Sequence, residues 1–156
     1  MTTMKTLLDA AGIAARVPHH GTMCLLHALH ESSDTHVLCS ATSHRAADNP
    51  LRSASGLLAC NAIEYAAQAM ALHGAMTAAA SAPPRGGRLA SVRGVTLHVP
   101  LLDTIDGPLY VHAERLAGDA GQAMYQFTLR DKQQNTLVQG RATVLLSPES
   151  SAAHLS

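Results

Sequence analysis

One stretch dominates what this chain can fold into: residues 57–80, LLACNAIEYAAQAMALHGAMTAAA. Nearly every position holds a good helix former or a small apolar residue, proline is absent, and the single glycine, Gly74, comes late. At about 1.5 Å per residue, such a helix would be roughly 35 Å long, about the width of a small domain. A helix that is apolar nearly all round is a buried one. We therefore expect the rest of the chain to cover it.

Polar residues form one stripe along this predicted helix. Asn61, Glu64 and Gln68 are three and four residues apart, so they lie on one face. A carboxylate on an apolar helix costs free energy unless it is paired, so Glu64 needs a reason to be there. It is either part of a site or a structural group that bonds the start of a neighbouring helix in a dimer.

Composition excludes several classes of protein. The 11 basic residues balance the 11 acidic ones and aromatic residues make up only 3%, which argues against a nucleic-acid partner. The three cysteines are widely spaced and odd in number, as in a reducing compartment. Residues 1–20 make a poor signal peptide, and the polar stripe argues against a membrane span over residues 57–80. We expect a cytoplasmic protein without a membrane span.

The order of predicted elements indicates an α+β domain. A short helix over residues 3–15 precedes a strand pair, then comes the long helix, and four more strands follow. The six predicted strands are 23–31, 35–43, 89–99, 109–116, 122–130 and 136–146. An antiparallel sheet can bury the helix only by curling around it, which leaves the edges of the sheet or the flank of the helix to a second subunit. We predict one domain over residues 1–146 and a disordered tail over residues 147–156.

Three segments resemble one known family. The segment VPHHGTMCLL at residues 17–26 resembles a Leu-Pro-His-Arg…Leu-Leu entry into the first strand. The segment EYAAQ at residues 64–68 matches Glu-Ala-Met-Ala-Gln at its first, fourth and fifth positions, and VTLHVP at residues 95–100 resembles a strand that ends in Arg-Pro-Val. These are features of the hotdog fold and of its 3-hydroxyacyl-[acyl-carrier-protein] dehydratases.

Two further segments are most similar to a divergent branch of that family. They are NPLR at residues 49–52 and IEYAAQAMA at residues 63–71. The branch comprises dehydratase-like proteins of aryl-polyene and related biosynthetic clusters, and some of its members are thought to serve as partners of an active dehydratase. The implied partners are an acyl carrier protein and a second subunit, in a homodimer or in a heterodimer with a dehydratase.

The resemblance implies a site with three parts. A histidine removes the proton alpha to the thioester, a helix carboxylic acid protonates the departing 3-hydroxyl, and amides at the helix start hold the thioester oxygen. Glu64 stands in the place of the acid, and an apolar helical environment would raise its pKa and keep it protonated. The amides near Ala59 and Cys60 are the candidates for the thioester oxygen. Gln68 either bonds loop backbone or contacts the ligand.

The expected histidine is missing. Asn49 is the best match to its position, and the Pro-Gly that closes the family's motif is absent. An amide cannot accept a proton near neutral pH, so Asn49 is at most a substrate-binding residue. His44 lies five residues upstream and is the candidate to fold back as a substitute base. His19 is expected to pack and hydrogen-bond within the connector before the first strand.

No metal or cofactor is expected. Cys24, His27 and His30 are spaced by three, but in a strand the first two point to opposite faces. Neither C-x-x-C nor H-E-x-x-H is present.

Three functions remain open at this point. The first is a dehydratase that uses Glu64 as acid and His44 as base. The second is a non-catalytic subunit that holds a partner dehydratase or a carrier protein. The third is a hotdog thioesterase, in which one helix carboxylate activates water.

Overall fold

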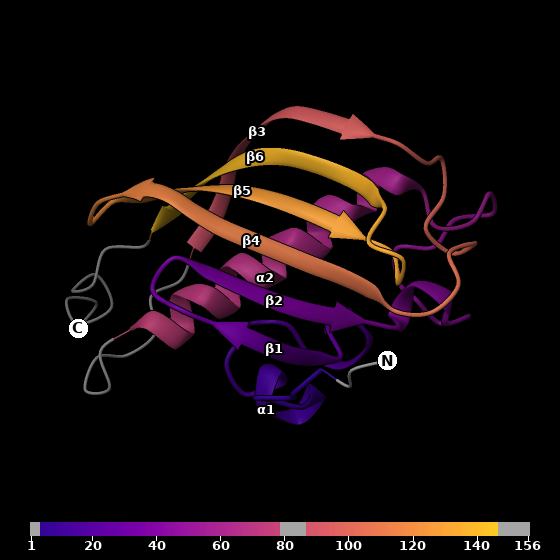
Figure 1. The fold of residues 1–156 in the computed structure, drawn as a ribbon, viewed down its shortest axis with the longest axis horizontal. Coiled ribbons are helices and arrows are strands. Elements are labelled where there is room, and N and C mark those ends of the chain that lie inside the picture. The colour runs from indigo at the N-terminus through magenta and orange to yellow at the C-terminus, as the bar shows by residue number, and fades with distance from the viewer. Residues whose placement is uncertain (1–3, 79–86, 147–156) are drawn as a thin grey trace, which may run out of the picture.

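A six-stranded antiparallel sheet and one long helix make up most of the structure, a computed structural model that describes residues 4–78 and 87–146 (Figure 1). The strand order is β1-β2-β4-β5-β6-β3. The strands are β1 (Ala28–Ser32), β2 (His36–Ala41), β3 (Gly87–Leu97), β4 (Leu109–Gly118), β5 (Gln122–Arg130) and β6 (Thr136–Leu146). The helices are α1 (Ala10–Ala14) and α2 (Ala62–Thr77), with 3-10 turns η1 (Gly21–Met23), η2 (Ser43–Arg45) and η3 (Ala59–Asn61).

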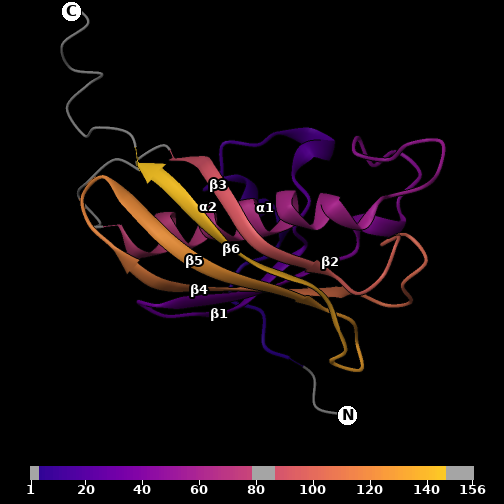
Figure 2. The same cartoon turned by 90° about the horizontal axis from the view of Figure 1, so that it is seen from above.

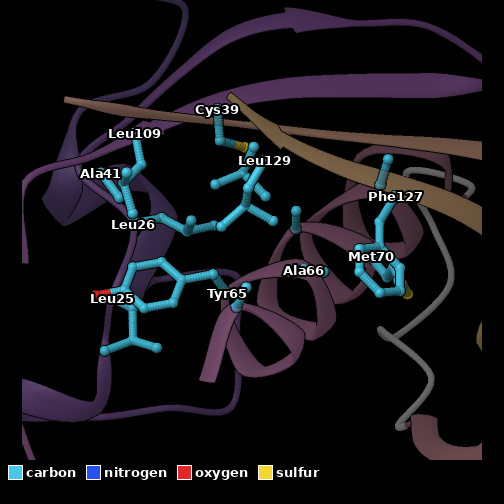
Figure 3. Close-up of a cluster of buried hydrophobic side chains, with 14 of the residues drawn as sticks. Leu25, Leu26, Cys39, Ala41, Tyr65, Ala66, Met70, Leu109, Phe127 and Leu129 are labelled. Atoms are coloured by element: carbon cyan, nitrogen blue, oxygen red, sulfur yellow. The ribbon is translucent and has the colours of Figure 1, made fainter. Parts of the chain in front are cut away.

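The sheet curves around α2 and buries one side of it (Figures 1 and 2). Successive side chains of a strand point to opposite faces of the sheet, and the apolar face is the one that packs against α2. In β4, Leu109, Val111 and Ala113 are buried, and the residues between them are partly exposed. The buried residues of neighbouring strands lie side by side on this face, because Val111 pairs with Cys39 of β2 and with Leu129 of β5. Figure 3 shows the resulting core, in which sheet residues meet α2 at Tyr65, Ala66 and Met70.

The central helix is shorter than predicted. It begins at Ala62 rather than at residue 57, because the backbone before it pairs with another loop. Leu102 N donates to Leu57 O at 2.8 Å, and Ala59 N donates to Pro100 O at 3.0 Å. This pairing outweighs the helix propensity of the local sequence. Residues 79–80, the end of the predicted helix, lie outside the described residues.

The side of α2 that faces away from the sheet is open in the single chain, and it is the helix flank that we predicted could be left to a second subunit. The helix is not buried all round: Glu64, Ala67 and Ala71 are partly exposed and Gly74 is exposed. The single sheet covers the opposite side, where Tyr65, Ala69 and Leu72 are buried.

The strand predictions agree best in the second half of the chain. Residues 122–130 and 136–146 are strands with the predicted bounds. The first predicted strand, 23–31, is wrong in its first half: residues 21–23 form a 3-10 turn, and the strand begins at Ala28. The predicted N-terminal helix is reduced to Ala10–Ala14, which Asp9 caps. Residue 3, where the predicted N-terminal helix starts, and the tail at 147–156 fall outside the described residues.

Across residues 4–78 and 87–146, neither α1 nor α2 is long and apolar enough to cross a membrane.

Candidate functional site

A groove of about 460 Å³ runs along the open side of α2. Its floor is a row of small side chains on the helix, and the connector at residues 15–19 forms one wall. The ends of β3, β5 and β6 complete it through Leu89, Tyr125 and Val144. The groove is thus built by segments that are far apart in the sequence.

The groove carries a carboxyl group at one end and small apolar side chains along the helix. Glu64 and His19 mark the polar end, while Ala67, Ala71 and Ala75 continue along the helix. Ala75 lies 11 positions after Glu64, so the groove follows the helix for about 16 Å. This shape suits a ligand with a polar group at one end and an apolar chain.

Glu64 and His19 face each other at the polar end. His19 Nε2 lies 3.3 Å from Glu64 Oε1, and the two side chains are 26% and 35% exposed. Glu64 stands in the first turn of α2, where the helix dipole favours a negative charge. Its surroundings are therefore not the wholly apolar ones expected from the sequence. His19, which we expected to bond within the connector, instead reaches the predicted acid.

Gln68 fixes the connector to the helix. Its side chain is fully buried, its Nε2 donates to Met23 O at 2.6 Å, and its Oε1 accepts from Leu25 N at 2.9 Å. This matches the loop-bonding alternative for Gln68. Contact with a ligand stays a prediction.

Asn49 lies within a buried polar network and does not line the groove. Its Nδ2 donates to Ser43 O at 2.9 Å and to the Tyr65 hydroxyl at 3.1 Å, and its Oδ1 accepts from Leu51 N at 2.9 Å. The Tyr65 hydroxyl also bonds Ser43 Oγ at 2.8 Å, and Ser43 Oγ donates to Leu25 O. Burial raises the pKa of Tyr65. The network holds the loop after β2 against α2.

His44 does not fold back toward Glu64 within the chain. It is buried, and its Nε2 donates to Ile105 O at 3.0 Å. Burial lowers the pKa of His44, and hydrogen bonds to Ile105 and Gly107 only partly offset this. Its Nδ1 is buried without a partner in the described part of the chain. His44 is thus a neutral core histidine, held by the loop that precedes β4.

The start of α2 provides fewer free backbone amides than we predicted. The Ala59 amide is already bonded to Pro100 O. Cys60 is exposed, and its thiol is free. Of the two predicted amides, only that of Cys60 remains a candidate for a substrate oxygen.

Within the described ranges, no three His, Cys, Asp or Glu side chains converge as a metal site would require.

Sequence reasoning missed His19 as a partner of Glu64. The one signal was its place in the segment VPHHGTMCLL, whose counterpart in the resembling family also holds a histidine after proline. Nothing in the spacing of residues 19 and 64 brings them together, because their contact depends on how the connector crosses the helix.

Known proteins similar to this chain include dehydratases and thioesterases. A family model of ApeP-like proteins, described as ApeP dehydratase, matches residues 11–155. The structure resembles the dehydratase heterocomplex ApeI:P of Xenorhabdus doucetiae, with TM-score 0.74 and 25% identity over 92% of this chain and 95% of that chain. A search of curated proteins found no match.

Two thioesterases share the fold. One, from Haemophilus influenzae, has TM-score 0.68 and 9% identity over 97% of this chain and 99% of that chain. The other, a mutant from Staphylococcus aureus, has TM-score 0.60 and 15% identity over 77% and 92%. Together with the strand order and the central helix, these likenesses confirm the predicted hotdog fold.

Proposed function

The chain belongs to the ApeP-like dehydratase family, and from that premise we propose that it acts on or binds 3-hydroxyacyl thioesters of acyl carrier protein in fatty-acid or polyene-type biosynthesis. The observation that carries the proposal is Glu64, a carboxyl group at the polar end of a groove whose apolar part continues for about 16 Å. The thioester end of a substrate would lie beside Glu64, and the acyl chain would lie along the small side chains of α2.

In dehydration, the bond from Cα to hydrogen and the bond from C3 to the hydroxyl oxygen both break. A base takes the Cα proton, an acid protonates the departing hydroxyl, and water leaves. We assign the acid to Glu64. The loop after β2 supplies no base within this chain, because Asn49 is an amide and His44 is directed to Ile105.

We therefore propose that a second subunit binds this chain and completes the site. The edge strand β3 pairs only with β6 in the described chain, and most of its residues are exposed on both faces, with Leu89 at 40% and Leu97 at 49%. An edge strand of this kind is a template for pairing with another chain. Because the structurally similar ApeI:P is a dehydratase heterocomplex, we propose a dehydratase subunit as the partner. It would supply the missing base.

The non-catalytic alternative keeps the same interface. In it, the chain positions a partner dehydratase or a carrier protein, and Glu64 takes no part in the reaction. All three cysteines are free, which is consistent with the reducing cytoplasm that we propose for either arrangement.

One observation favours a second candidate function. Glu64 is accompanied by a histidine and is partly open to solvent, so its carboxylate could activate water for thioester hydrolysis. This thioesterase would release a free thiol rather than an enoyl product.

The test is turnover of a 3-hydroxyacyl thioester by the chain alone, by a family dehydratase alone and by the two together. We expect 2-enoyl product from the complex, reduced roughly 10²-fold or more by Glu64→Gln, as for loss of a general acid. Glu114→Gln is the matched control, because Glu114 is an exposed carboxylate on β4 away from the groove.

Two other results would support the alternative functions. Full turnover by a complex that carries Glu64→Gln would overturn the catalytic assignment and support the non-catalytic subunit. Thiol release without enoyl product would favour the thioesterase.

A further inference from the structure

We propose that His19 is the positioning residue of Glu64: its Nε2–H holds Oε1 and leaves Oε2 as the oxygen that faces a ligand in the groove. The inference rests on the proposed function and deepens it, because it concerns the same carboxyl group. It starts from the 3.3 Å contact between His19 Nε2 and Glu64 Oε1 at the polar end of the groove.

The backbone that carries His19 is held in place. Pro18 restricts the residue before it, and Val17 is anchored in the core. The Cys24 thiol donates to His19 O at 2.8 Å, which closes the connector on itself. Gln68 then binds Met23 and Leu25, so the connector is clamped to α2 one turn beyond Glu64. The imidazole is therefore set relative to the helix and not only to its own loop.

Burial of the other ring nitrogen determines where the proton lies. His19 Nδ1 is buried and has no partner among the described residues. A buried N–H without an acceptor costs more than a buried lone pair, and an imidazolium would leave a charged N–H in that position. Of the two tautomers, the one with its proton on Nε2 fits these surroundings better, and in our proposal this N–H is directed at Glu64 Oε1, 3.3 Å away.

The other polar side chains that line the groove are engaged elsewhere. Arg16 donates from its guanidinium to Gly12 O at 2.9 Å, and the Tyr125 hydroxyl bonds His73 Nδ1 at 2.8 Å. His19 is therefore the groove residue that contacts Glu64 within the described chain. Loss of this contact frees the carboxyl group to rotate, and misplacement of a reacting group by about 1 Å can cost roughly 10²-fold in rate.

A spectroscopic experiment tests the pair without any turnover. Long-range ¹H–¹⁵N spectra of the labelled full-length chain at pH 8, with His19 assigned by its loss in His19→Phe, report which ring nitrogen carries the proton. We expect the Nε2–H form, with an Nε2–H proton signal that disappears in Glu64→Ala through faster exchange with solvent. The Nδ1–H form, or an Nε2–H signal unaffected by Glu64→Ala, would overturn the proposal.

A kinetic experiment on the complex tests what the pair does. We expect His19→Phe, which keeps a ring but removes both nitrogens, to lower kcat roughly 10²-fold with KM nearly unchanged. His19→Gln, which restores a donor, should recover most of that loss. His20→Phe is the matched control, since His20 is exposed and outside the groove.

Equal kcat for the wild type and His19→Phe would overturn the positioning role, and so would an equal loss in the Phe and Gln variants. If no variant of the complex, wild type included, dehydrates the substrate, the proposed function fails. The spectrum then decides the His19–Glu64 pair separately.

Discussion

At position 49, a buried asparagine holds together the loop after β2. Its amide makes two donor bonds, to Ser43 O and the Tyr65 hydroxyl, and one acceptor bond, from Leu51 N. A neutral imidazole has only one donor and one acceptor, so it cannot satisfy the same three groups. The loop is thus built around an amide, and a histidine would not fit its hydrogen bonds.

The variant Asn49→His tests this reading. We expect the free energy of unfolding to fall by about 1–3 kcal/mol, because at least one buried polar group loses its partner. Urea denaturation measures the change, with Gln133→His at an exposed position as the control. Unchanged stability, together with turnover gained by the chain alone, would show that position 49 is open to a catalytic base.

Buried histidines make the fold sensitive to acid. Burial lowers the pKa of both His44 and His73 below the ordinary value of 6.5. Below pH 6.5 the unfolded chain binds protons that the folded chain does not, so stability should be complete above this pH and decline as the pH falls. Each group contributes at most about 1.4 kcal/mol for each pH unit until its folded pKa is reached.

The measurement is urea unfolding at a series of pH values for the wild type and for His44→Gln. The variant should have a smaller slope below pH 6.5, whatever its stability at pH 8. His20→Gln, at an exposed position, is the control for replacing a histidine by glutamine. A slope in His44→Gln equal to that of the wild type would contradict the assignment of His44.

At the scale of elements, Gln68 joins the connector to α2, and its loss should be local. We expect Gln68→Ala to expose the Leu25 amide, because Gln68 Oε1 is the acceptor of that buried N–H. Hydrogen exchange at Leu25 should accelerate, and unfolding should cost about 1–3 kcal/mol less. The Ile13 amide, which bonds Asp9 O, is the internal reference. Unaltered protection at Leu25 would show that another group holds the connector.

Sequence pattern predicted the elements whose structure is decided locally. Alternation in residues 122–130 predicted β5 with the bounds that the structure has. The start of α2 could not be predicted, because loop backbone at Pro100 and Leu102 pairs with the preceding residues. The contact between His19 and Glu64 could not be predicted either, because it depends on the path of the connector across α2.

For the whole molecule, the proposed function implies that the groove limits the length of the acyl chain that can bind. Gly74 lines it far from Glu64, and a Cβ at this position would meet no atom within 4 Å. Gly74→Leu should therefore fold, with its helix favoured by up to about 1 kcal/mol, and block the apolar end. We expect KM to rise for long acyl thioesters and to stay constant for short ones.

Thr77→Leu is the control for Gly74→Leu, because Thr77 is exposed near the end of α2 and outside the groove. A KM that rises equally for short and long substrates would contradict the place given to the acyl chain.

Edge strand and groove together describe a subunit that offers one half of a site. The exposed β3 is the edge at which we propose that a second chain pairs. In the same proposal Glu64 supplies the proton, and the partner supplies the base that the loop after β2 lacks. The central claim is that Glu64 provides this proton in the complex with a dehydratase.

Single-turnover dehydration of a 3-hydroxyacyl thioester on acyl carrier protein, by the preformed complex, tests that claim most directly. Glu64→Gln in this chain should slow formation of the 2-enoyl product roughly 10²-fold or more, while Glu114→Gln leaves the rate unchanged. Equal rates for the wild type and Glu64→Gln would contradict the account.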